Sequence, residues 1–115
     1  MKADAHLAKA REIQASINVL KMNGAEQHVV SIVEMVYGVA QHLISYGMEQ
    51  KYGKHLDSHV GLPRELRLLD EDEIAQKFER LDTLRYGRWY GKQGNGKIVK
   101  ECLKLLSDIE RWAIK

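Results

Sequence analysis

Apolar side chains recur every three or four positions along most of this chain, which is the spacing of one face of an α-helix. The first such stretch covers residues 3–22 and stops at Asn23-Gly24, because glycine commonly follows the end of a helix. The second covers residues 25–52, with apolar residues on one side and polar residues opposite, which predicts an amphipathic helix. Its expected polar side consists of Gln27, Ser31, Glu34, Gly38, Gln41, Ser45 and Glu49.

Further helices are expected in the second half of the chain. Residues 54–69 have a mixed pattern, in which Pro63 suits the first turn of a short helix. Asp70 is expected to cap the next helix, with Glu73 three positions later as in a capping box. The last helix is expected to begin near Asn95, which would be its cap. No stretch has the alternation of a β-strand, and no internal repeat is found.

The pattern therefore predicts an all-α fold, an up-down antiparallel bundle of four to five helices. A chain of 115 residues fits a single domain, here residues 1–115, and its composition of 44% hydrophobic and 30% charged residues is that of a globular protein. No apolar run approaches the roughly 20 residues that cross a bilayer, so we expect no membrane-spanning helix. The acidic start of the chain argues against a signal peptide, and a cytoplasmic protein is expected. The only cysteine, Cys102, is expected to be a buried thiol.

Charge is nearly balanced, with a formal net charge of +2, but it is unevenly distributed. Acids cluster in residues 70–73. Between residues 80 and 104 the only acidic residues are Asp82 and Glu101, whereas basic residues are numerous. The basic residues are Arg80, Arg85, Arg88, Lys92, Lys97, Lys100 and Lys104. The sequence therefore predicts one basic end, which alone is too weak a signal to imply nucleic acid.

Residues 91–97 match the spacing of a phosphate-binding loop, with glycine, four residues, glycine and Lys97. Such a loop should follow a strand and continue with a serine or threonine that binds magnesium, but Ile98 occupies that position. A turn between helices is the favoured interpretation, and Lys97 could still face a phosphate at a helix N-terminus.

The histidines suggest no metal site. His55 and His59 are four residues apart and Asp57 could be a third ligand, but the surrounding glycines and Pro63 favour an irregular segment with exposed histidines. His28 and His42 are expected at the surface. No cofactor is expected.

A cluster of arginine and aromatic residues covers residues 85–90, with Arg85, Arg88 and Tyr90 among them. Such a cluster suits stacking on bases and binding of phosphate. It equally suits an aromatic plug that closes one end of the bundle, with arginines at a helix C-terminus. Both interpretations stay open from the sequence.

The order of features resembles a known family. Ser31, Glu34 and Tyr37 follow one another at three-residue steps on one helix, and Leu84-Arg85 leads to Tyr90 after an acid-capped helix. In this order, over roughly residues 3–114, the chain resembles the HEPN family of small helical bundles. The resemblance implies a homodimer, and many such proteins are metal-independent ribonucleases with an arginine followed by a histidine. Several are toxins paired with a small nucleotidyltransferase.

The chain departs from that motif in one respect. Arg85 matches the arginine, but Tyr90 stands where the family has its histidine, and no histidine follows His59. Tyrosine, with an ordinary pKa near 10, is a poor acid–base group at neutral pH. We therefore expect a non-catalytic module that binds RNA or a nucleotide, or a nucleotidyltransferase-like partner. Its ligand-binding residues would be Arg85, Arg88, Tyr90, Glu34 and Lys97. The alternatives are an active ribonuclease, with His55 or His59 replacing the histidine, and a purely structural interaction bundle.

Overall fold

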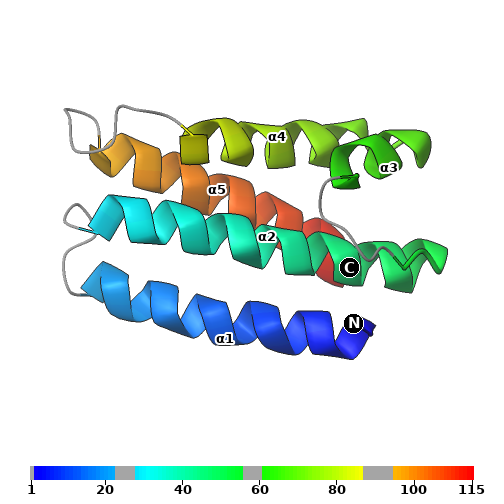
Figure 1. Cartoon of the computed structure of the whole chain (residues 1–115), viewed down its shortest axis with the longest axis horizontal. Helices are drawn as coiled ribbons and strands as arrows, with labels where there is room; N and C mark the ends of the chain where they lie inside the picture. The colour runs from blue at the N-terminus through cyan, green and yellow to red at the C-terminus, as the bar shows by residue number, and fades with distance from the viewer. Residues whose placement is uncertain (1, 23–27, 56–60, 87–94) are drawn as a thin grey trace.

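The computed structural model describes residues 2–22, 28–55, 61–86 and 95–115. These residues form five α-helices and no strand, which confirms the predicted all-α bundle. The helices are α1 (Ala3–Met22), α2 (Val29–Tyr52), α3 (Leu62–Leu68), α4 (Asp72–Tyr86) and α5 (Asn95–Ile114). The four long helices run alternately up and down along the length of the molecule, and the short α3 lies beside the start of α4 (Figure 1).

Helix α2 lies at the centre of the bundle and contacts each of the other four helices. Its expected polar side is therefore partly wrong. Ser45 is buried, and Gly38 is half-buried opposite Ile13 of α1. The helix is buried on more than one side because α1 covers one flank while α4 and α5 cover the others. Apolar residues on those sides complete the core, and they include Ile32, Val36, Val39, Leu43 and Met48.

The same helix corrects the expectation that no segment is apolar enough over a sufficient length to cross a membrane. Among the described residues, α2 alone is long and apolar enough to cross a membrane by length and composition. Half of the residues in that apolar stretch are buried against other helices in the structure. Central helices of soluble proteins share this composition.

The turn between α3 and α4 has a different construction from the predicted one. Asp70 does not cap α4; it has a φ of 61° and follows the end of α3. Its backbone N–H donates to the Arg67 carbonyl (3.1 Å), and the Glu71 N–H donates to the Leu66 carbonyl (2.8 Å), the pair of bonds of a Schellman motif. Aspartate tolerates this left-handed conformation better than most residues. The cap was therefore assigned to the wrong helix.

Helix α5 packs tightly against α2 at Gly47. A β-carbon at this position would lie 2.6 Å from Cζ3 of Trp112 and 3.1 Å from Cα of Ala113. The absence of a side chain at Gly47 thus leaves room for the Trp112 ring. The contact fixes the C-terminal half of α5 on the bundle.

Candidate functional site

Four side chains form a continuous stack from the core to the surface where α4 ends. Phe78 is buried, and its ring stacks on Tyr37 of α2 with centroids 4.9 Å apart. The guanidinium carbon of Arg85 lies 4.0 Å from the Tyr37 ring centroid and 4.6 Å from that of Tyr86. The ring of Tyr86 ends the stack, and this residue is 70% exposed.

Two carboxylates flank the guanidinium of Arg85. Its Nε and Nη2 donate hydrogen bonds to Oδ1 of Asp82 (3.2 and 2.8 Å), and its Nη1 lies 3.8 Å from Oε2 of Glu34. Partial burial acts to lower the pKa of Arg85, but the hydrogen bond with Asp82 and the charges of Tyr37 and Asp82 outweigh it, so the pKa lies above its ordinary value. Arg85 is therefore a permanently charged group whose charge is already balanced inside the protein.

Lysines at the start of α5 supply positive charge at the same end of the bundle (Figure 1). Lys97 and Lys100 are exposed and form no ion pair with any residue that the structure describes. Arg80 of α4, by contrast, donates two hydrogen bonds to the carboxylate of Glu101 (2.6 and 3.0 Å) and thereby joins α4 to α5. Among the described residues of this end, an anion could therefore reach these lysines without breaking an ion pair.

The structure brings together part of the predicted site. Arg85 and Glu34, which are 51 positions apart in the sequence, are an ion pair across α4 and α2. Lys97 lies in the first turn of α5 at the same end. Arg88 and Tyr90, together with residues 91–94 of the glycine-rich segment, lie outside the described residues.

Sequence reasoning missed two partners of Arg85. Asp82 precedes it by three positions on one helix, which is the spacing of neighbouring side chains, so this contact had a local signal. Tyr37 was noted only for its three-residue spacing from Glu34, and the packing of α2 against α4 places its ring beside the guanidinium. No local pattern predicts that contact.

A pair of histidines lies away from this stack. His6 of α1 is buried, and its Nδ1 lies 2.9 Å from Nδ1 of His42 on α2. The surface position expected for His42 is therefore wrong: it is half-buried because it faces α1. His55 Nδ1 lies 3.6 Å from Oε2 of Glu49, while Asp57 and His59 are outside the described residues. Among the residues that are described, no group of three or more histidine, cysteine or acidic side chains could hold a metal ion.

Comparisons of the chain with protein-family models, with curated proteins and with solved structures find no match. The resemblance to the HEPN family therefore stays a prediction.

The surface at the end of α4 and the start of α5 combines the exposed ring of Tyr86 with ammonium groups that have no ion-pair partner among the described residues. Aromatic rings stack on the bases of single-stranded nucleic acids, and lysines bind their phosphates. Because Asp82 and Glu34 occupy the guanidinium of Arg85, that residue is better suited to holding Tyr37 and Tyr86 in place. Within the described part of the chain, the ligand contacts available at this surface are thus the ring of Tyr86 and the ammonium groups of Lys97 and Lys100.

Proposed function

We propose that this protein is a cytoplasmic, non-catalytic helical module that binds single-stranded RNA or a nucleotide where α4 ends and α5 begins. One observation carries the proposal: the exposed ring of Tyr86 ends a stack that is anchored in the core through Arg85, Tyr37 and Phe78. A ring held in this way loses little conformational freedom when a base stacks on it.

The residues of the site have different roles in this proposal. A base stacks on Tyr86, and Lys97 and Lys100 bind the adjoining phosphates. Arg88 and Tyr90, which follow α4 in the sequence, stay candidate ligand contacts that lie outside the described residues. Arg85 is a positioning residue, and Glu34 contributes by holding its guanidinium.

The described neighbours of Arg85 support binding rather than RNA cleavage. They are two tyrosines and two carboxylates, and the sequence has Tyr90 where the related ribonucleases have histidine. The carboxylates beside the guanidinium of Arg85 also repel a further anion, such as a phosphate, from that group. Phosphate contacts are therefore assigned to the lysines of α5.

Fluorescence polarisation with a short fluorescein-labelled single-stranded RNA tests the proposal. Tyr86→Ala should weaken binding by about 1–3 kcal/mol, the usual value of one stacked base. Lys97→Ala should reduce the salt dependence of binding, because one phosphate contact is lost. Tyr52→Ala is the matched control, since Tyr52 is an exposed tyrosine at the C-terminal end of α2.

Two outcomes would contradict the proposal. One is that the RNA does not bind at low salt, or binds equally well to Tyr86→Ala and to Tyr52→Ala. The other is that the RNA is cut during the titration, which would instead support the ribonuclease alternative.

A second candidate function is docking of a protein, either a second copy of this chain or a nucleotidyltransferase-like partner. Exposed apolar side chains at the α1–α2 end of the bundle favour it. Met22 is 87% exposed near the end of α1. Val19 of α1 and Val30 at the start of α2 are each more than half exposed. Sedimentation equilibrium of the wild type and of Met22→Ser would detect a homodimer at this surface, and co-purification with a co-expressed nucleotidyltransferase would detect that partner.

A further inference from the structure

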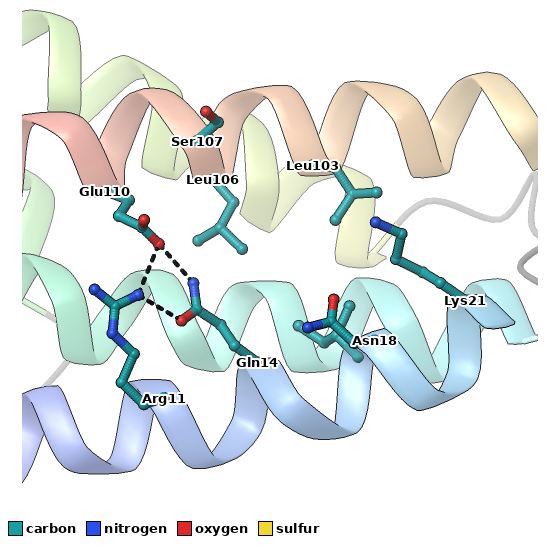
Figure 2. A pocket seen from close by; sticks show the side chains of 9 residues that line it. Arg11, Gln14, Asn18, Lys21, Leu103, Leu106, Ser107 and Glu110 are labelled. Atoms are coloured by element: carbon teal, nitrogen blue, oxygen red, sulfur yellow. Dashed lines mark hydrogen bonds and ion pairs between the residues drawn. The ribbon is translucent and has the colours of Figure 1, made fainter.

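A groove of about 410 Å³ runs between α1 and α5, on residues that the proposed RNA site does not use (Figure 2). Both helices pack against α2, and they run in opposite directions along the bundle (Figure 1). The groove is therefore a channel between two antiparallel helices, with its long side open.

The groove has an apolar floor and a polar rim. Ile17 and Leu106 are buried beneath it, and the half-buried Leu103 contributes its α5 side. Asn18 and Lys21 form the α1 rim, where Lys21 extends across the groove towards α5 (Figure 2). Lys21 forms no ion pair with any of the described residues.

One carboxylate faces the groove, and its charge is already neutralised. Oε1 of Glu110 accepts hydrogen bonds from Nη1 of Arg11 (3.1 Å) and from Nε2 of Gln14 (2.7 Å). Arg11 also donates to the side-chain oxygen of Gln14 (2.8 Å), so the three side chains form a closed network (Figure 2). With two cations and one carboxylate in its lining, the groove has an excess of positive charge at Lys21.

We propose that this groove docks an acidic amphipathic helix of a partner protein. Apolar side chains of the helix, spaced three or four residues apart, contact the floor, and a flanking glutamate or aspartate pairs with Lys21. A partner with basic flanks is disfavoured because the Glu110 carboxylate already has two donors.

The dimensions favour a helix over a small molecule. From Arg11 to Lys21 the α1 side of the groove is about 15 Å long, at a rise of about 1.5 Å per residue, which equals about three turns of a docked helix. A small molecule would keep much of its surface in water along the open side, whereas ligand sites usually enclose most of the ligand.

The test uses three fluorescein-labelled model peptides of about 18 residues, since helices shorter than roughly 12–15 residues are marginal in water. The first has leucines at helical spacing with glutamate flanks, the second has the same leucines with lysine flanks, and the third has the glutamates with serine replacing each leucine. Only the first should bind the full-length protein, with an affinity that falls as salt rises.

Two variants of the protein test the charge requirement. Lys21→Glu and Asn18→Glu should each weaken binding of the acidic peptide by about tenfold or more, because like charges across an interface oppose association. Lys9→Glu makes the same charge change as Lys21→Glu on a residue of α1 outside the groove, and should leave the affinity within about twofold. Circular dichroism establishes that each variant is folded.

Each remaining outcome contradicts the inference. These are equal binding of the lysine or serine peptide, an effect of Lys21→Glu no greater than that of Lys9→Glu, and a dimer that Lys21→Glu dissociates, which would make the occupant a second copy. RNA binding reports separately: Tyr86→Ala should leave peptide binding unchanged, and Lys21→Glu should change RNA affinity no more than Lys9→Glu does. Failure of one site is thereby distinguished from failure of the other.

Discussion

The Nδ1 atoms of His6 and His42 lie 2.9 Å apart and join the N-terminal half of α1 to the middle of α2. A hydrogen bond at this distance requires one Nδ1 to carry a proton and donate it, and the other Nδ1 to be unprotonated and accept it. Burial of His6 and the proximity of His42 lower the pKa of His6 to about 4, while Glu49 raises it and the N-terminus and His55 lower it further. Burial of His6 therefore opposes its protonation in the folded protein.

The first prediction is a loss of stability in mild acid. In the unfolded chain His6 binds a proton at about pH 6.5, but in the folded protein only near pH 4, so the unfolded state binds more protons in that window. Stability should fall as pH falls from about 6.5 to 4, by up to about 3 kcal/mol at 1.36 kcal/mol per pKa unit. Urea unfolding at several pH values measures this.

His6→Leu should flatten that pH dependence, since the apolar side chain does not titrate. His42→Leu should raise the pKa of His6, because the repulsion from His42 is removed. A stability profile in His6→Leu with the slope of the wild type would show that His6 is not the titrating group.

The second prediction concerns the close approach of α5 to α2. Gly47→Ala should lower the free energy of unfolding by about 1–3 kcal/mol, because the added methyl group overlaps Trp112 and the backbone of Ala113. Gly38→Ala is the matched control on the same helix, where a methyl group would meet only Cδ1 of Ile13 at 3.7 Å. There the higher helix propensity of alanine should raise stability by up to about 1 kcal/mol. Equal effects of the two substitutions in thermal unfolding would contradict the packing.

The third prediction is that Cys102 is unreactive in the folded protein. Its side chain is buried in the core, as the sequence predicted, and burial together with the charge of Glu101 raises the pKa of the thiol to about 12. Because the thiolate is the nucleophile, a thiol reagent should modify the native protein only after it unfolds. Rapid modification of the native protein at neutral pH would show that α5 does not cover this residue.

The fourth prediction separates Arg85 from the lysines. Arg85→Ala should lower stability by about 1–2 kcal/mol, because it uncovers the Tyr37 ring and leaves Asp82 and Glu34 without their cation. Lys97→Ala should change stability by less than about 0.5 kcal/mol, since Lys97 is exposed and unpaired among the described residues. Similar losses in urea unfolding would contradict the positioning role of Arg85.

The sequence predicted helix existence well because the apolar period of a helix is a local signal. Helix α1 spans the predicted residues, and α5 begins near the predicted start, although Asn95 is its first helical residue rather than its cap. The prediction that Asp70 caps α4 was wrong because an acid between two consecutive helices can either end the first or cap the second. The left-handed φ of Asp70 decides between the two, and residue type alone does not reveal it. The predicted polar side of α2 was partly wrong because several helices cover a central helix. The periodicity of its sequence does not reveal how many helices pack against it.

The candidate site was predictable only where its contacts are local. Asp82 and Arg85 are three residues apart, so their pairing follows from helix geometry. The Tyr37–Arg85 stack and the His6–His42 contact join residues far apart in sequence, and they depend on how the helices pack. Such contacts leave no pattern in a single sequence.

The most direct test of the proposed function is an NMR titration of the isotope-labelled full-length protein with single-stranded RNA. If the RNA binds at the end of the stack, amide signals from the last turn of α4 and the first turns of α5 should shift progressively, including those of Tyr86, Lys97 and Lys100. Signals at the far end of α2, near Tyr52, should remain in place. Shifts absent from α4 and α5, or confined to other helices, would contradict RNA binding at this site.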